Sequence, residues 1–337
     1  MALHIIQAGL GSWGRDWYGS VLRRHPGVKV VAFVDGDEDA LAAARAEHDL
    51  EPARCFASIE KAAREVRADA ALVTASLPGH ARLCRAALAA GLHVLVEKPF
   101  VPTVREAREL AASAGRRRRV LMVSQNYRWQ PAVRAVQKAI RGGRLGAVAT
   151  VAIDFRRHAN GQQPDHRHYH IVEPLLLDMA VHQMDLLRAV LGREAVEVYC
   201  WSTNPPWSKF RGSPSASALL RFGGDISVNY RGSWIAHHAE TPWAGMWTIE
   251  CERGAVVWTS RGSEADELVA IHRAGAPPEV VTLPRLRFLD RAGCLDAFVK
   301  SVRTGVAPET SARDNVNTIE LVNAVIASAR TRRTVRL

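Results

Sequence analysis

The sequence has 337 residues, 47% of them hydrophobic and 23% charged, which is the balance of an ordinary globular protein. The net charge of +11 is spread along the chain, and the one tight basic run, Arg116 to Arg119, is typical of a solvated surface, so we expect no nucleic-acid partner. No apolar run approaches the roughly 18 residues of a membrane helix, so we expect no membrane partner either.

Short apolar runs alternate with helical segments in the first third of the chain. We expect helices after a glycine turn near residue 11 and at 40–48, 77–91 and 104–114. Strands are predicted between them, at 3–8, 28–34, 70–74, 94–96 and 120–124. This alternation is typical of a parallel sheet covered by helices on both faces.

The glycine turn between the first strand and the first helix reads Gly-Leu-Gly-Ser-Trp-Gly from Gly9 to Gly14. In this pattern the first glycine permits the turn, the second lets a pyrophosphate approach, and the third lets helix and strand pack closely. Asp35 ends the second strand, where a carboxylate can bind both ribose hydroxyls and repels a 2′-phosphate. The pattern predicts a dinucleotide, NAD in preference to NADP. A strand–turn–helix without a ligand is the alternative.

A second polar group, Glu97-Lys98-Pro99, directly follows a predicted strand. Ligands of open α/β sheets lie at the carboxyl ends of the strands, so Lys98 is placed to face a nicotinamide ring. A solvated loop lysine is the alternative.

The pattern changes after residue 123. Helices are expected at 131–141, 174–191, 289–303 and 314–329. Strands are expected at 148–155, 217–222, 226–230, 247–251 and 255–259. These features predict a Rossmann domain with a doubly wound parallel sheet over 1–123. They also predict an α+β domain with a large open, mostly antiparallel sheet over 124–337, whose closing helix at 314–329 can pack back on the first domain.

The predicted helix at 174–191 carries Asp178, His182 and Asp185 at i, i+4 and i+7, on one face of an otherwise mostly apolar circumference. This arrangement favours a largely buried helix that lines a cavity. A carboxylate near a histidine tunes its pKa, as general acid–base catalysis requires. A buried His–Asp pair that only fixes packing is the alternative.

Histidines alternate in the loop at 165–170, which reads Asp-His-Arg-His-Tyr-His. Such residues can chelate a metal, but no defined ligand set accompanies them, so we expect no metal. We expect this loop, with His168, to contact the substrate.

Together these residues resemble the Gfo/Idh/MocA family, named for glucose–fructose oxidoreductase and inositol dehydrogenase. The resemblance covers nearly the whole chain. It rests on the glycine turn, Pro78-Gly79-His80, Glu97-Lys98-Pro99, Asn126-Tyr127-Arg128, Gly143-Arg144-Leu145-Gly146 and the Asp178, His182, Asp185 spacing. One departure is Glu173-Pro174, where the family usually has glycines.

The resemblance implies a sugar or polyol substrate, a homodimer or homotetramer formed through the second sheet, and a cis Lys98–Pro99 peptide. It implies catalysis by Lys98, His182 and Asp178. The cofactor is expected to contact Gly9, Gly11, Ser12, Trp13, Gly14, Asp35, Ser76, His80, Glu97 and Lys98. The substrate is expected to contact Lys98, Tyr127, Arg128, His168, Asp178 and His182.

The function expected is therefore hydride transfer between NAD and a hydroxyl or keto carbon of a sugar, cyclitol or related polyol. An NAD-recycling glycosidase of the same family and a non-catalytic NAD-binding regulator are the alternatives. Five scattered cysteines without a Cys-x-x-Cys pair argue against disulfides and zinc, and the N-terminal residues lack a targeting signal, so we expect a cytoplasmic protein.

Overall fold

The computed structural model describes residues 2–164, 166–263 and 266–337, and the chain divides into two compact units. The first unit comprises the chain through Asn126 together with Phe288–Ile319, and the second comprises Tyr127–Arg287 with Glu320–Leu337. The boundary expected near residue 123 lies slightly before the observed one. The expected return of the closing helix to the first domain agrees with its residues up to Ile319, whereas the return of 288–313 was not part of the predicted division.

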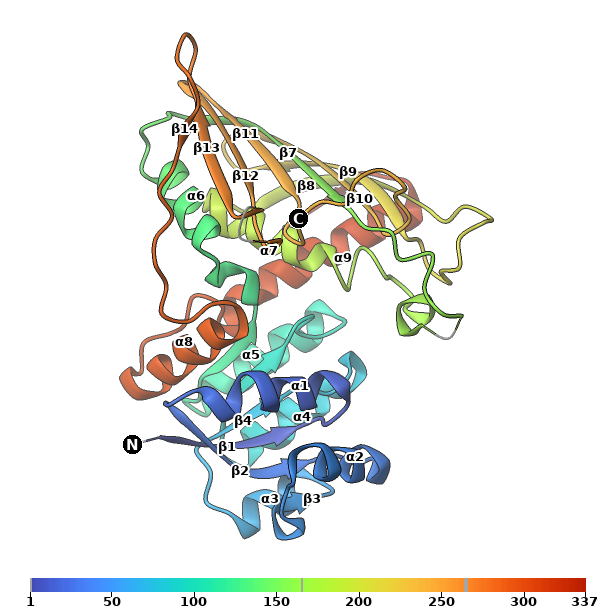
Figure 1. The fold of residues 1–337 in the computed structure, drawn as a ribbon, viewed down its shortest axis with the longest axis vertical. Coiled ribbons are helices and arrows are strands. Elements are labelled where there is room, and N and C mark those ends of the chain that lie inside the picture. Colours follow the sequence, from blue (N-terminus) through green and yellow to red (C-terminus); the bar gives the residue numbers. More distant parts are fainter. Residues whose placement is uncertain (1, 165, 264–265) are drawn as a thin grey trace. The chain divides into compact units, whose positions relative to one another are not determined.

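The first unit is built on a six-stranded parallel sheet in the order β3-β2-β1-β4-β5-β6, which confirms the predicted doubly wound fold (Figure 1). Its strands are β1 (Leu3–Ala8), β2 (Val28–Val34), β3 (Cys55–Phe56), β4 (Ala70–Val73), β5 (His93–Glu97) and β6 (Leu121–Ser124). Its helices are α1 (Ser12–Ser20), α2 (Glu38–His48), α3 (Ile59–Glu65), α4 (Leu77–Ala89), α5 (Val104–Arg116), α8 (Asp290–Thr304) and the first part of α9 (Ala312–Thr331).

Both faces of this sheet are covered, and its strands are accordingly apolar along most of their length. Ala32 and Val34 belong to a core with residues of α3, α4 and α5. Phe33, which points to the other face, makes an edge-on ring contact of 4.9 Å with Tyr18 of α1. Continuous apolar strands of this kind are typical of parallel sheets buried on both sides.

The sheet edge at β6 explains why the chain returns to the first unit. The backbone nitrogen of Val123 donates to the carbonyl oxygen of Thr310 at 2.9 Å, and the Gln125 amide donates to Asn315 Oδ1 at 2.9 Å. Asn126 also donates a hydrogen bond to the carboxylate of Asp290. These bonds tie 288–319 to β6, so pattern changes along the sequence could not mark this segment.

The second unit contains a nine-stranded sheet in the order β14-β13-β12-β11-β7-β10-β9-β8-β15, which confirms the predicted large, mostly antiparallel sheet. The parallel pairing of β7 with β10 in this sheet was not predicted. Its strands are β7 (Val148–Arg156), β8 (Ala195–Thr203), β9 (Ser215–Phe222), β10 (Ile226–Ser233), β11 (Met246–Cys251), β12 (Gly254–Thr259), β13 (Leu268–His272), β14 (Glu279–Val280) and β15 (Val335–Arg336). The helices are α6 (Pro131–Arg141), α7 (Ala180–Leu191) and the second part of α9 (Ala312–Thr331). In the described ranges, no helix is long and apolar enough to cross a membrane.

Burial alternates along the central strands of this sheet. In β9, for example, Ala216, Ala218, Leu220 and Phe222 are buried while the residues between them are exposed. The buried side chains form one core with α6, α7 and residues 321–326 of α9, which all lie on one face of the sheet (Figure 1). The opposite face of the sheet is open.

Candidate functional site

The glycine turn of the first unit has the geometry that the sequence predicts. Gly9 has a φ of +100°, and a β-carbon built on it would lie 2.1 Å from the backbone nitrogen of Ala75. A β-carbon on Gly14 would lie 1.9 Å from the carbonyl oxygen of Gly9. A β-carbon on Gly11, in contrast, would meet no atom within 4 Å. Packing therefore requires Gly9 and Gly14, whereas the space beside Gly11 is open at the N-terminus of α1, where a phosphate binds well.

Asp35 is tied to this turn by its carboxylate. One oxygen accepts a hydrogen bond of 2.6 Å from Leu10 N, and the other accepts one of 3.0 Å from Asp37 N. Asp35 is half-buried, and a carboxylate oxygen has lone pairs for further donors such as ribose hydroxyls. The open glycine, the helix N-terminus and this carboxylate together fit a dinucleotide.

Three further predicted cofactor residues lie at the starts of helices. Ser12 and Trp13 form the exposed first turn of α1, and the Arg291 guanidinium lies 4.4 Å above the Trp13 ring. Ser76 is exposed and precedes α4 as its N-cap. Their contact with a cofactor stays a prediction.

The loop that carries Lys98 is fixed by the buried Glu97 before it. Trp17 Nε1 donates to one Glu97 oxygen at 2.8 Å, and Lys98 N donates to the other at 3.1 Å. The expected cis peptide between Lys98 and Pro99 is present. Sequence reasoning missed Trp17, because a tryptophan on an amphipathic helix gives no signal beyond core packing.

His80 has a clear role within the protein. Its Nδ1 lies 2.9 Å from the carbonyl oxygen of Pro99, and its Nε2 lies 2.9 Å from that of Ala75. The buried ring therefore joins the end of β4 to the loop after Lys98. The described contacts support a positioning role, and a direct contact of His80 with the cofactor stays a prediction.

The helix predicted at 174–191 is wrong at its start. The regular helix α7 begins only at Ala180, and the preceding residues form turns. In these turns Asp178 N bonds to Glu173 O and Ala180 N bonds to Leu175 O, five residues back instead of four. Asp178 thus lies before the helix, and helical periodicity does not place it on one face with His182 and Asp185. The expected burial of the helix is confirmed, since all of Ala180–Leu191 is buried.

His182 lies in a stack of rings within the second unit. Its imidazole is parallel to the Tyr127 ring, with 3.8 Å between ring centroids and 5° between planes. Arg261, which the sequence did not single out, places its guanidinium carbon 4.2 Å from the Tyr127 centroid. The structure therefore brings two predicted substrate residues, Tyr127 and His182, into contact.

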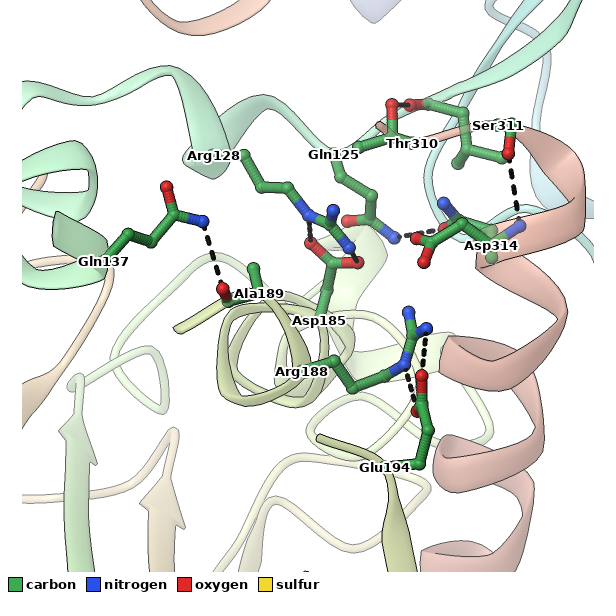
Figure 2. Close-up of polar contacts among 12 residues, drawn as sticks. Gln125, Arg128, Gln137, Asp185, Arg188, Ala189, Glu194, Thr310, Ser311 and Asp314 are labelled. Atoms are coloured by element: carbon green, nitrogen blue, oxygen red, sulfur yellow. Dashed lines mark hydrogen bonds and ion pairs between the residues drawn. The ribbon is translucent and has the colours of Figure 1, made fainter. Parts of the chain in front are cut away.

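Arg128 and Asp185 form a buried ion pair (Figure 2). Arg128 Nε lies 2.7 Å from one carboxylate oxygen of Asp185 and Nη2 lies 2.6 Å from the other. Their side chains are 6% and 2% exposed. One turn later on α7, Arg188 forms a bidentate ion pair with Glu194, in which Nε and Nη2 each donate to one carboxylate oxygen. The Arg128 guanidinium holds α7 in place, and its predicted contact with substrate stays a prediction.

His168 lies in a short 3₁₀ turn, Arg167–His170, with its ring 5.5 Å from that of Trp234. Asp165 of the same loop lies outside the described residues. Among the residues that the structure describes, no group of three or more histidine, cysteine, aspartate and glutamate side chains could hold a metal ion. Aromatic rings surround His168 in this loop, and its contact with substrate stays a prediction.

The buried cysteines do not offer a reactive thiolate. Burial raises the pKa of the Cys84 and Cys294 thiols, and it raises that of Cys200 to about 12. Because the thiolate is the nucleophilic form, these three side chains are protonated at neutral pH and unreactive. Their position indicates core packing.

Two family models match the chain in succession. Residues 3–125 match the model described as an oxidoreductase family with an NAD-binding Rossmann fold. Residues 133–257 match the model of the GFO/IDH/MocA C-terminal domain. The first match covers every strand of the first sheet, and the second covers the second sheet from β7 into β12.

Relatives and solved structures agree with these matches. The D-apiose dehydrogenase of Paraburkholderia graminis is 28% identical over 92% of this chain and 84% of its own length. The aldose-aldose oxidoreductase of Caulobacter crescentus has a TM-score of 0.86 at 20% identity, with both chains fully covered. An inositol dehydrogenase homolog of Azotobacter vinelandii, solved with NADH and myo-inositol, has a TM-score of 0.84 at 18% identity over 100% of this chain and 98% of its own. The fold is thus shared with these enzymes.

Proposed function

Because this chain belongs to the Gfo/Idh/MocA family of NAD-binding oxidoreductases, we propose that it oxidises a hydroxyl group of a sugar, cyclitol or related polyol in the cytoplasm. The observation that carries this proposal is the open space beside Gly11, next to a carboxylate held by the same turn. Packing requires glycine at positions 9 and 14 but not at Gly11, and this supports a ligand that approaches the backbone there. Dehydrogenase names among the relatives give the substrate class.

The preferred cofactor in this proposal is NAD. Asp35, followed by the exposed Asp37 and Glu38, surrounds the expected ribose position with negative charge that repels a 2′-phosphate. Replacement Asp35→Ser removes the acceptor of the ribose hydroxyls, so kcat/KM with NAD should fall by about 10- to 100-fold. The preference for NAD over NADP should shrink at the same time. An unchanged ratio of the two would contradict the assignment.

Chemically, the bound nicotinamide would supply the hydride acceptor. In the proposal His182 takes the hydroxyl proton, Lys98 stabilises the developing negative charge on oxygen as an ammonium donor, and Asp178 orients the substrate. Alcohol oxidation needs a base to remove the hydroxyl proton and benefits from a cation that stabilises the resulting alkoxide, and His182 and Lys98 are residues of these two kinds. Tyr127 and His168 would contact the same substrate.

The experiment is a panel of sugars, inositols and glycosides, scanned with NAD and with NADP for reduced nicotinamide. Turnover with net reduction supports a dehydrogenase. Turnover of a glycoside without net reduction indicates the recycling glycosidase instead, and NAD binding without any turnover indicates a regulator.

Lys98→Met and His182→Ala should each lower turnover by about 10²- to 10⁴-fold, while His272→Ala, at an exposed position, should not. Wild-type rates in the first two variants would overturn the roles given to them.

The partner proposed for the open sheet face is a second copy of the chain. This face holds a groove of about 660 Å³, lined by Tyr199, Trp201, Leu219 and Met246 among others, and all four side chains are more than a third exposed. Apolar patches of this kind mark protein interfaces. Sedimentation velocity should show an oligomer that Leu219→Lys dissociates and that Val306→Lys, at an exposed apolar position of the first unit, leaves intact. A wild-type monomer would contradict this.

A further inference from the structure

Tyr127 is sandwiched between an imidazole and a guanidinium. The His182 centroid lies 3.8 Å from the Tyr127 centroid in a parallel stack, and the Arg261 guanidinium carbon lies 4.2 Å from that centroid. Two groups this close to one six-membered ring cannot share a face without overlapping. Arg261 and His182 therefore lie on opposite faces of Tyr127, in a three-layer stack.

The backbone around Arg261 is built to hold this position. Arg261 follows β12 with a φ of +66°, which side-chain-bearing residues adopt seldom and at a cost. Its backbone nitrogen and the hydroxyl of the buried Ser260 both donate to Glu267 Oε1, each at 2.6 Å. The other Glu267 oxygen accepts from Ala132 N in the first turn of α6, at 3.3 Å. Several hydrogen bonds therefore hold Arg261 in an unfavourable backbone conformation, and residues held in this way are often functional.

A second connection leads from the same turn to α7. The carbonyl oxygen of Arg261 accepts a hydrogen bond of 3.0 Å from Trp243 N. The carbonyl oxygen of Trp243 in turn accepts one of 3.3 Å from the amide of Gln183, the neighbour of His182. The turn at Arg261 thus reaches His182 through the Tyr127 ring and through the backbone of Trp243.

We propose that Arg261 is a positioning residue that acts through Tyr127 to fix the plane of the His182 imidazole. The inference rests on the proposed function for the acid–base role of His182. The lone pair and the N–H bond of an imidazole lie in the plane of its ring, so the plane of the His182 ring sets the direction in which it can exchange a proton. A guanidinium binds the far face of the tyrosine by cation–π attraction and keeps that ring from turning. Small errors in such orientation cost large factors in rate.

The test is an NMR measurement on the full chain with ¹³C-labelled histidine and no added ligand. The His182 Cε1–H signal, assigned by its loss in His182→Gln, should lie upfield because the Tyr127 ring shields it. Tyr127→Leu should move it downfield, Tyr127→Phe should leave it, and Arg261→Met should move it part of the way downfield. Arg261→Lys, which keeps the cation, should restore much of the shift. Arg273→Met, at an exposed arginine of the same unit, is the matched control.

The same variants separate positioning from bulk structure. With a panel substrate that is turned over, Arg261→Met should lower kcat by about 10- to 100-fold and leave KM and the dissociation constant of NAD near wild type. If Arg261→Met does not fold, Glu267→Gln tests the same idea, because it only loosens the turn and should also move the His182 signal downfield. A wild-type His182 signal in a folded form of either variant would overturn the proposal. Full activity of His182→Ala would instead refute the proposed function and leave the NMR result unaffected.

Discussion

The two units hold their candidate residues by different means. In the first unit the backbone shapes the cofactor turn: two glycines are required by close contacts with neighbouring main chain, and a main-chain nitrogen binds Asp35. In the second unit side chains from distant segments hold His182, with Tyr127 before α6 and Arg261 after β12. A site shaped by the backbone is encoded by a short contiguous motif in the sequence. A site held by side chains is encoded by residues that lie far apart in the sequence.

The buried ion pair on α7 provides the strongest test of this contrast. Arg128→Met leaves the Asp185 carboxyl group buried and deprived of this partner, so the free energy of unfolding should fall by about 3–5 kcal/mol in urea denaturation. Arg273→Met, which breaks an exposed pair with Glu279 of 2.8 Å, should cost about 0–1 kcal/mol. Equal losses in the two variants would show that the second unit does not depend on its buried pair.

The glycine turn tests the backbone side of the comparison. Gly14→Ala should lower the free energy of unfolding by about 1–3 kcal/mol because its β-carbon collides with the main chain of Gly9. Gly11→Ala should unfold at the wild-type temperature but weaken NAD binding by about tenfold or more in calorimetry, since the methyl group fills the phosphate position. If Gly11→Ala binds NAD normally, the open space beside this residue does not receive the phosphate.

Trp17 shows that one side chain also matters in the first unit, because its indole donates a hydrogen bond to Glu97 before Lys98. Removing this donor tests how far the first unit depends on side chains. Trp17→Phe keeps an aromatic ring in the core but removes the indole donor to Glu97 and leaves part of the buried volume unfilled, so it should cost at least about 1.5–3 kcal/mol in thermal or urea unfolding. The exposed Trp207→Phe is the control and should have no measurable effect. A neutral Trp17→Phe would mean that Lys98 N and the surrounding packing suffice to hold Glu97.

The smallest effect is expected at Glu240 in the second unit. The backbone N–H of His158, together with Arg157, lowers the pKa of Glu240. A lowered carboxyl pKa stabilises the fold above the ordinary pKa, and this stability is lost as the pH falls through the folded-state value. Because the side chain is 45% exposed, Glu240→Gln should cost less than about 1 kcal/mol at neutral pH. The difference in melting temperature should vanish in acid, and a constant difference at every pH would contradict the assignment.

Sequence patterns predicted the parts of the fold that local chemistry determines. Five strands of the first sheet, the glycine turn and the five central strands of the second sheet follow from apolar runs and turn residues. The short strand β3 and the outer strands β8, β13, β14 and β15 were not singled out. The start of α7 was not predicted either, because the hydrogen bonds of Asp178 and Ala180 reach back five residues, which helical periodicity cannot reveal.

The candidate site was predicted only as far as its residues lie in recognisable motifs. Tyr127 and His182 were singled out, yet their parallel stack depends on tertiary packing. Arg261 carries no local signal, since an arginine in a turn between strands is ordinarily solvated. The Glu267 carboxylate that holds its backbone is visible only in three dimensions.

The pairing of β6 with residues 310 and 311 has a consequence for synthesis of the chain. All of Tyr127–Arg287 is translated between the two partners, so the nascent first unit leaves the ribosome with one sheet edge incomplete. Closing a loop of this length slows folding. Until residues 310 and 311 are synthesised, the exposed edge of β6 can pair with a strand of another chain. Since the second unit also includes Glu320–Leu337, neither unit is complete in a nascent chain that has grown only to Arg287.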